Sequence, residues 1–599
     1  MRNTLLLLLS VIYFNNLQAQ AFLDYIGAGN SAGVKVTSSH DYRALGSNQT
    51  ASGEQTLNGS GMDSRMMDAA RFLAQATFGA DENLIRQIAE TDYSDWIDSQ
   101  FEVPPGYLLP EVINAYNLAF QIYTDNGGLA ANYSDRPEWE HFDYAWWQVN
   151  LTADDLLRQR VAYSLSQILV VSVESDLFDK GEALADYYDM LLEHSFGNYK
   201  DLLMAVTLHP AMGIYLSHLN NSKAIPERNI HPDENYAREI MQLFSIGLFE
   251  LNQDGSRKKD SNGAYIPTYS NSDIKEFAKV FTGLGAGGSI SKTDLNKADF
   301  NMDFNLIDFT VPMKMYEDYH ETAEKLLLNG FTIPAGHPGM TDVEQAVDHL
   351  FNHPNVAPFI SRQLIQRLVK SNPTPAYISR IASVFSDNGN GIRGDLKSVI
   401  KAILLDPEAR NCDWINHPDQ GRLREPITRY TQFAKSVGFE NQLDLFWNNG
   451  SAFMESAGQH PFHSYTVFNF YLPDFQPNGP IAQNNLVGPE YQIHNTKTSV
   501  GYVNAVNNWA FNDELLYTFE ANTFPTRPAF KNLLPFARDP DELINKLDIL
   551  LTHGQMSDDT RDIIKNAIKG FSQNSIGDLQ RLKLALYLIM ISPDYCVLK

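Results

Sequence analysis

Hydrophobic residues recur at helical spacing through most of the chain. From residue 64 onward, apolar side chains repeat every three or four positions, and Ser, Thr or Asp often precede these stretches. That period, with those boundary residues, predicts amphipathic helices. The predicted helices cover roughly residues 64–78, 152–171, 183–195, 198–207, 231–244, 272–283, 316–328, 342–352, 356–370, 376–386, 394–405, 424–437, 540–552, 558–569 and 577–591.

Strand patterns are few. Residues 248–252 and 265–268 read as short strands, and the sequences between them contain Asp254-Gly255 and Asn262-Gly263, which favour tight turns. We expect a hairpin that leaves the main helical body at this point. The predicted fold class is therefore mainly α: a multi-helix globular protein with a minor β-hairpin excursion and a long aromatic, Asn- and Pro-rich loop region.

Changes in composition along the chain suggest its organisation. Residues 1–21 combine a positive start, a short apolar run and a small-residue cleavage site, which is typical of a secretory signal peptide. Residues 22–63 are rich in Gly, Ser, Thr and Asn and predict a flexible leader. We expect a main helical domain over residues 64–437, an irregular aromatic-rich insert over 438–530, and C-terminal helices over 531–599 that pack on the main domain.

Composition and charge limit the classes of function. A formal net charge of -26 makes nucleic acid a poor partner. No segment after the signal peptide is long and apolar enough to span a bilayer, so we expect an exported protein that is periplasmic or secreted. The chain has 2 cysteines, too few for a disulfide scaffold or a zinc site of several thiolates.

The segment 231–244 carries the densest group of reactive side chains. On a helix, Tyr236 and Ile240 lie on the apolar stripe, while Asn235 and Glu239 lie along its flank. Glu239 is therefore the carboxylate that we expect to be half-buried, and a half-buried carboxylate can serve as a general acid or base. The alternative is structural: Arg238 forms an ordinary surface pair with a neighbouring carboxylate, and Glu239 bridges to another helix.

Two further stretches could supply partners for Glu239. His320 and Glu324 lie one turn apart on the predicted helix 316–328, where they could share a proton or a divalent metal, or form a surface pair. Arg362 and Arg367 lie on the polar side of helix 356–370. They could bind an anionic substrate group, or they could form ion pairs with carboxylates of neighbouring helices.

Arg424 lies at the start of the predicted helix 424–437 and is a further candidate for binding an anionic group. A role in capping that helix is an equally simple explanation. No haem, nucleotide or flavin motif is present in the sequence. The cofactor therefore stays unknown, with a divalent metal as one possibility.

An ordered series of short motifs resembles the bacterial family called domain of unknown function 1800, from about residue 71 to the C-terminus. The motifs are Phe72-Leu73-Ala74-Gln75-Ala76-Thr77-Phe78-Gly79, Leu157-Arg158-Gln159-Arg160-Val161-Ala162, Asp233-Glu234-Asn235-Tyr236-Ala237-Arg238-Glu239, Phe281-Thr282-Gly283, His320 with Lys325, His353-Pro354-Asn355-Val356, Arg393-Gly394-Asp395-Leu396 and Leu423-Arg424-Glu425-Pro426. The resemblance implies a mainly helical, exported bacterial protein. It also implies a possible partner, because members are often encoded beside sulfatase- or phosphatase-like proteins. It implies no catalytic residue.

Two hypotheses follow. In the first, Glu239, His320 and Arg238 form a catalytic group, and the protein contributes to extracellular polysaccharide processing by acid–base chemistry. The residues that would bind substrate in this hypothesis are Arg362, Arg367, Arg424 and Asn235. In the second hypothesis the same polar groups stabilise a helical scaffold without catalysis, and the aromatic segment from His460 to Phe475 binds a partner such as the sulfatase-like protein.

Overall fold

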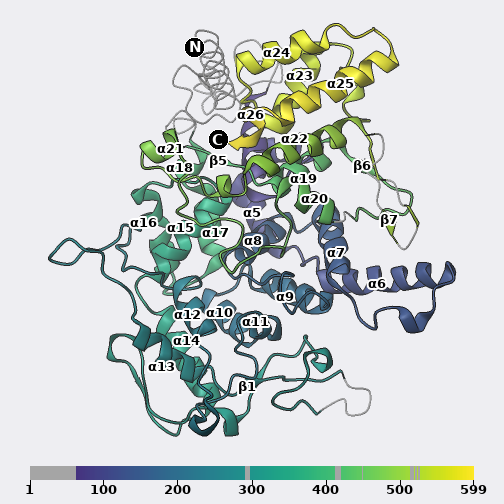
Figure 1. Cartoon of the computed structure of the whole chain (residues 1–599). Coiled ribbons are helices and arrows are strands. Elements are labelled where there is room, and N and C mark those ends of the chain that lie inside the picture. The colour runs from purple at the N-terminus through teal and green to yellow at the C-terminus, as the bar shows by residue number, and fades with distance from the viewer. Residues whose placement is uncertain are drawn as a thin grey trace, which may run out of the picture.

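The computed structural model describes residues 63–290, 297–411, 420–447, 450–512, 518–519, 522–523 and 526–599. Helices dominate these residues, and the strands form only two-stranded sheets (Figure 1). The mainly α fold class is therefore confirmed. The proposed signal peptide, all of the leader except residue 63, and Cys412 lie outside the described residues.

The chain forms a long series of helices, with short strands between some of them. The first half contains α3 (Ser64–Ala76), α4 (Glu82–Ala89), α5 (Tyr93–Glu102), α6 (Leu108–Asp125), α7 (Trp139–Thr152), α8 (Leu156–Ser166), α9 (Gly181–His194), α10 (Tyr199–Leu208), α11 (Pro210–Tyr215), α12 (Asn235–Gln242), α13 (Asn271–Val280), β1 (Leu284–Gly285), β2 (Lys314–Met315), β3 (Lys325–Leu326) and β4 (Thr332–Ile333). The second half contains α14 (Gly339–Phe351), α15 (Val356–Leu368), α16 (Pro375–Ser386), α17 (Leu396–Leu405), α18 (Pro407–Arg410), β5 (Arg422–Leu423), α19 (Pro426–Val437), β6 (Phe439–Glu440), α20 (Gly450–Ala457), α21 (Pro480–Gln483), α22 (Thr496–Phe511), β7 (Thr518–Phe519), β8 (Asn522–Thr523), β9 (Arg527–Pro528), α23 (Pro540–Leu547), α24 (Asp558–Ile568), α25 (Ser575–Met590), α26 (Pro593–Cys596) and β10 (Val597–Leu598).

The hairpin over residues 248–268 is present as predicted. Antiparallel bridges join Phe249 to Pro267 and Lys259 to Tyr265, and the segment projects from the body between α12 and α13 (Figure 1). The helix predicted over residues 316–328 is wrong. A short 3-10 turn over Glu317–Tyr319 and strand β3 occupy that stretch, and β3 pairs with β4. Pairing and burial by tertiary contacts outweigh the weak helical period of this stretch.

One continuous hydrophobic core holds most of the molecule together. It contains Trp146 of α7, Leu165 of α8, Trp509 of α22 and Leu586 of α25, each of them buried. The segment 438–530 contributes to this core through α22, a 16-residue helix, so it is more helical than its composition suggests. In the described residues, the helices do not reach the length and hydropathy that crossing a bilayer would require.

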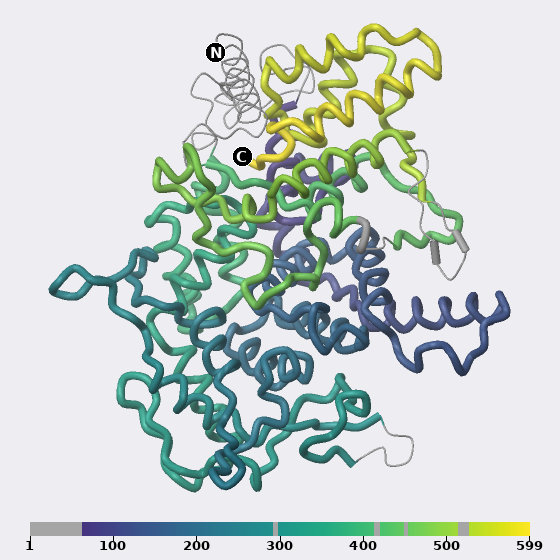
Figure 2. Tube along the Cα trace, viewed as in Figure 1, coloured from purple at the N-terminus to yellow at the C-terminus, as the bar shows by residue number. Residues whose placement is uncertain are grey.

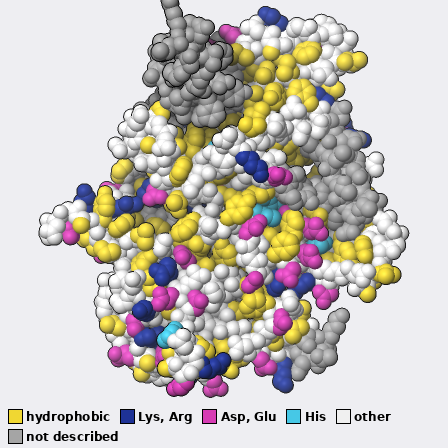
Figure 3. All heavy atoms as spheres, viewed as in Figure 1, with side chains coloured by type: hydrophobic (Ala, Val, Ile, Leu, Met, Phe, Trp, Pro, Cys, Tyr) yellow, Lys and Arg dark blue, Asp and Glu magenta, His cyan; other side chains and the backbone are white. Residues whose placement is uncertain are grey.

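A loop between α20 and α21 crosses the helical body and shapes its centre. The green trace of this segment runs over the blue helices in Figure 2. It is anchored by its backbone, because Phe462 O accepts a hydrogen bond from Val173 N at 2.7 Å, and Pro473 O accepts one from Gln366 Nε2 at 2.9 Å. The anchored loop carries two histidines toward α7. On the face shown in Figure 3, Lys and Arg lie scattered among Asp and Glu.

Candidate active site around His463

Helix α7 and the crossing loop bring two histidines onto one carboxylate. Asp143 and Trp147 lie four residues apart on α7 and so share a helical face. Asp143 Oδ1 lies 3.2 Å from His460 Nδ1 and 3.1 Å from His463 Nε2. The indole N–H of Trp147 donates to His460 Nε2 at 2.7 Å. Side chains of α7 therefore contact both ring nitrogens of His460 and one ring nitrogen of His463.

Trp147 fixes the protonation pattern of His460. An indole nitrogen is a donor only, so His460 Nε2 must accept and the proton of the neutral ring lies on Nδ1, facing Asp143. Burial lowers the pKa of His460, and this outweighs the attraction of Asp143, which keeps the ring neutral. Burial raises the pKa of Asp143, but the two histidines more than compensate, and the net shift is downward.

His463 differs from His460 in both its pKa and its access to solvent. Burial lowers the pKa of His463, but the charge and hydrogen bond of Asp143 and the charge of Glu174 outweigh burial and raise it above 6.5. His463 keeps 6% of its surface exposed, whereas Asp143 and His460 keep none. Its Nδ1 has no hydrogen-bond partner among the described residues. Asp143 thus orients the ring and leaves one nitrogen available for proton transfer.

Aromatic side chains flank His463. The ring of Trp139 meets the imidazole edge-on with centroids 5.6 Å apart, and Phe178 lies 5.8 Å beyond Trp139. Phe178 is 52% exposed, so this aromatic pair reaches the surface. The backbone positions both rings, because Trp139 N donates to Phe178 O at the start of α7. His463 therefore lies beside a pair of aromatic rings, one of which is exposed.

The cluster has the ligand types of a divalent metal site. Asp143, His460 and His463 each offer one atom, and these atoms lie within 4.8 Å of one another. His460 would have to bind through Nδ1, which would place its proton on Nε2, against the N–H of Trp147. Two donors cannot share that contact, so a metal would require Trp147 or His460 to move. The arrangement as it stands fits proton transfer better than metal binding.

Glu239, predicted to be half-buried, is buried more deeply than that, and only 6% of it is exposed. Its Oε2 is buried and has no hydrogen-bond partner among the described residues. Burial raises the pKa of Glu239 to about 7, and the charge of Arg238 offsets this only in part. Arg238 itself pairs with Glu234 at 3.3 Å on the surface, which is the structural alternative stated for that residue.

His320 lies in a separate buried group. Its Nε2 is 3.2 Å from Asp342 Oδ2, its Nδ1 is 2.8 Å from Thr282 O, and it is fully buried. Lys325 Nζ donates to the same Asp342 oxygen at 2.6 Å. Because both ring nitrogens face oxygen atoms inside the protein, His320 offers no open nitrogen to a substrate. Glu324, its expected partner, is not on a shared helix face.

The remaining candidates have separate partners. Arg367 donates to Gln167 O at 3.0 Å, Arg424 donates to Leu551 O at 3.1 Å, and Asn235 Nδ2 lies 3.4 Å from a serine hydroxyl. Burial lowers the pKa of Arg362, with the charge of a nearby aspartate opposing it. Among the described contacts, no side-chain hydrogen bond or ion pair joins any two of the seven predicted site residues.

Asp143, His460 and His463 were missed in reading the sequence. Asp143 and His463 are 320 residues apart in the chain, so no local spacing could connect them. One signal was present: His460 and His463 stand three residues apart within the aromatic segment, at a spacing that lets two histidines meet one ligand. That spacing marks the pair as a candidate for binding one shared ligand.

Comparison with known proteins supports the family and adds no activity. No match was found among curated proteins or among solved structures. A sequence model described as "Protein of unknown function (DUF1800)" matches residues 71–597. That match spans most of the chain, from α3 to β10, and it includes the helix that carries Asp143 and the loop that carries His463. The chain therefore belongs to the DUF1800 family.

Proposed function

We propose that this protein is exported and contributes to extracellular polysaccharide processing, with His463 as the acid–base residue. The observation that carries the proposal is the hydrogen bond from His463 Nε2 to Asp143, which orients a ring whose Nδ1 stays open. In this role Nδ1 accepts a proton from water or a sugar hydroxyl as that oxygen attacks, and then returns the proton to the leaving oxygen. Asp143 stabilises the imidazolium that forms in between.

The surroundings of His463 favour a carbohydrate as substrate. Flat aromatic faces such as those of Trp139 and Phe178 stack on the apolar C–H faces of sugar rings. The exposed carboxylate of Glu174 also acts on His463, since its charge raises the histidine's pKa. Proton transfer between a histidine and sugar oxygens, beside an aromatic platform, is the chemistry that these residues support together.

Substitution of His463 tests the proposal. The mature protein is incubated with a panel of neutral and acidic polysaccharides, and new reducing ends and new double bonds are measured. We expect His463→Asn to lower the rate by about 10² to 10⁴-fold. The matched control is His209→Asn, because His209 also pairs with an aspartate, Asp186 at 3.0 Å, but uses its other nitrogen to cap α11. Equal rates for the wild type and His463→Asn would refute the assignment.

The pH profile gives a second test. A general base must be neutral, so the rate should rise with pH and reach half its maximum above pH 6.5, following the raised pKa of His463. Asp143→Asn removes the charge that raises this pKa, so the midpoint should move to lower pH. A midpoint that stays in place would mean that another group controls the rate.

A second candidate function is docking of a partner protein through the aromatic segment. The observation that favours it is exposure: Tyr465 is 73% exposed and Phe468 is 42% exposed. Large exposed aromatic side chains are typical of interaction surfaces, and the partner would be a sulfatase- or phosphatase-like protein encoded nearby. The test is capture from the native host with the wild type and with a Tyr465→Ser, Phe468→Ser double variant. Identical sets of captured proteins would end this alternative.

A further inference from the structure

The segment of residues 172–182 lies between the start of α7 and the crossing loop. On the α7 side, Phe178 O accepts a hydrogen bond from Trp139 N at 3.1 Å. On the loop side, Val173 N donates to Phe462 O at 2.7 Å. These backbone bonds fix the segment between the two elements that carry the proposed site.

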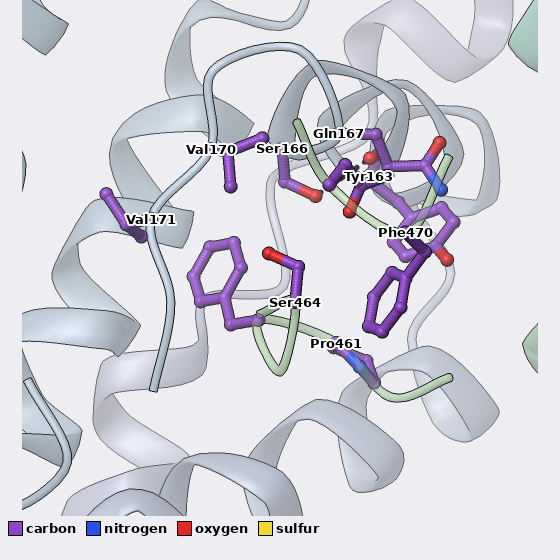
Figure 4. Close-up of a pocket in the computed structure, with 10 residues that line it drawn as sticks. Tyr163, Ser166, Gln167, Val170, Val171, Pro461, Ser464 and Phe470 are labelled. Atoms are coloured by element: carbon purple, nitrogen blue, oxygen red, sulfur yellow. Dashed lines mark hydrogen bonds between the residues drawn. The ribbon is translucent and has the colours of Figure 1, made fainter. Parts of the chain in front are cut away.

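The residues that lead into this segment also contact the loop. Figure 4 shows Pro461 and Ser464 of the loop lining the same small space as Val171. The next residue, Ser172, donates through Oγ to Ser464 O at 2.5 Å. The loop therefore contacts the segment through residues that precede and follow His463 in the chain.

The exposed charge around the site is negative. Residues 135–143 and 174–182 contain eight carboxylates and two cations, Arg136 and Lys180. Both cations are buried, and each is paired with a carboxylate, at 2.8 Å for Arg136. Residues 459–475 of the crossing loop contain no Lys or Arg. An anionic polymer would therefore be repelled at this surface, whereas a cationic one would be attracted.

Glu174 brings this negative charge next to His463. Its side chain is exposed, and its charge acts on the His463 ring. His463 is 6% exposed, and its Nδ1 has no hydrogen-bond partner among the described residues and is not sealed from solvent. A nitrogen of this kind beside an exposed carboxylate offers a hydroxyl group a hydrogen bond and an ammonium group a counter-charge.

An exposed aromatic ring adds a second means of binding a cation. Phe178 is 52% exposed, and its ring lies 5.8 Å from that of Trp139, which in turn meets His463 edge-on. The faces of aromatic rings attract cations, and organic ammonium groups are typical ligands of such faces. Glu174 and the exposed Asp176 precede Phe178 on the same segment. Carboxylates and an aromatic face are thus combined beside the unpaired histidine nitrogen.

We propose that the substrate of this site is a polysaccharide with free amino groups, and that Glu174 selects it. A protonated sugar amine pairs with the Glu174 carboxylate, the sugar ring lies on the face of Phe178, and a sugar hydroxyl reaches His463 Nδ1. The proposal rests on the function proposed above and deepens it, because it names the class of polysaccharide. Glu174 binds the substrate in this arrangement and takes no part in proton transfer.

The experiment measures binding to the mature protein by calorimetry at pH 6, where sugar amines are protonated. Three probes are compared: the glucosamine trimer with free amines, its N-acetylated form and the glucose trimer. We expect the free-amine trimer to bind about three- to tenfold more tightly than the acetylated one, with a Kd on the order of 1 mM or below. Added salt should weaken binding of the free-amine trimer and leave the two uncharged trimers nearly unchanged.

Variants locate the preference for amines. Glu174→Gln keeps the size of the side chain and removes its charge, so the advantage of the free-amine trimer over the acetylated one should fall about twofold to fivefold. The matched control is Glu542→Gln, which removes an exposed carboxylate on α23, among the C-terminal helices (Figure 1). It should leave the advantage unchanged, which separates a local site from general attraction of cations to an acidic protein.

Two comparisons keep the outcomes distinct. His463→Asn should bind the free-amine trimer at least as tightly as the wild type even if turnover is lost, so failure of binding and failure of catalysis are distinguishable. Trilysine tests whether the ligand is a basic peptide instead of a sugar. The proposal is overturned if the acetylated or glucose trimer binds as tightly as the free-amine trimer, if Glu174→Gln and Glu542→Gln have the same effect, or if trilysine binds more tightly than the amino sugar.

Discussion

Glu239 should make the protein less stable as the pH rises, and removing its charge should reverse this. The pKa of Glu239 is raised to about 7 from an ordinary value of 4.5. Between these two values the unfolded chain has lost a proton that the folded chain still holds, so folding stability falls with rising pH. Below pH 4.5 both states are protonated and the penalty is absent. Above pH 7 the penalty is complete.

The size of the effect follows from the pKa. At 1.36 kcal/mol for each pKa unit, the rise from 4.5 to about 7 corresponds to roughly 3 kcal/mol. The edge of the carboxyl that still meets solvent, and local relaxation, will reduce this. We therefore expect Glu239→Gln to stabilise α12 by about 1 to 3 kcal/mol at pH 8 and to have little effect at pH 4.

Hydrogen exchange of peptides that cover α12 is the appropriate assay, because it reports local opening and needs no reversible unfolding of a large protein. Each variant is compared with the wild type at the same pH, so the intrinsic pH dependence of exchange cancels. The control is Glu234→Gln, which alters a partly exposed pair at the N-terminus of the same helix and should change stability by less than about 1 kcal/mol. A gain for Glu239→Gln that is equal at pH 4 and pH 8, or absent at pH 8, would refute the reasoning.

Two further predictions concern buried polar groups. Lys325→Met leaves the Asp342 carboxylate buried without its main cation and should destabilise this region by about 3 to 5 kcal/mol, measured by hydrogen exchange of the peptides that cover β3 and α14. An effect below about 1 kcal/mol would contradict a charged pair. Trp147→Phe removes the donor to His460 Nε2, which should cost about 1 to 3 kcal/mol. The same variant should also bind Zn²⁺ more tightly than the wild type by calorimetry, because His460 can then present Nδ1 as a lone pair. Equal zinc affinity would contradict the assigned tautomer.

Local sequence patterns predicted the elements whose stability is local. The helix over residues 356–370 and the hairpin after residue 247 are present because amphipathic periodicity and Asn-Gly or Asp-Gly turns act over a few residues. The helix predicted over residues 316–328 is wrong because the conformation of this stretch depends on distant residues. Its conformation depends on Lys325 pairing with Ile333 in strand β4 and on Asp342 in α14, neither of which a helical period can reveal.

The same distinction applies to the candidate site. The position of Glu239 beside the apolar stripe of one helix predicted a half-buried carboxylate, and packing against the rest of the fold buries it further. The contact between Asp143 and His463 depends on a loop that crosses the core hundreds of residues later, so it needed the fold. Prediction from sequence alone therefore favoured residues that are close together in the chain, and the pairing of His320 with Glu324 reflects that preference.

The aspartate-paired histidines His209, His320 and His463 differ in the number of ring nitrogens that the fold already uses. His209 and His320 each have an aspartate on one nitrogen and a backbone group on the other. Either could take a proton from a substrate only by breaking a bond that holds its own segment in place. His463 has the aspartate and, among the described contacts, an open second nitrogen. A proton could reach this nitrogen without breaking a bond that holds the segment, and this is why we propose proton transfer for His463 and a stabilising role for His209 and His320.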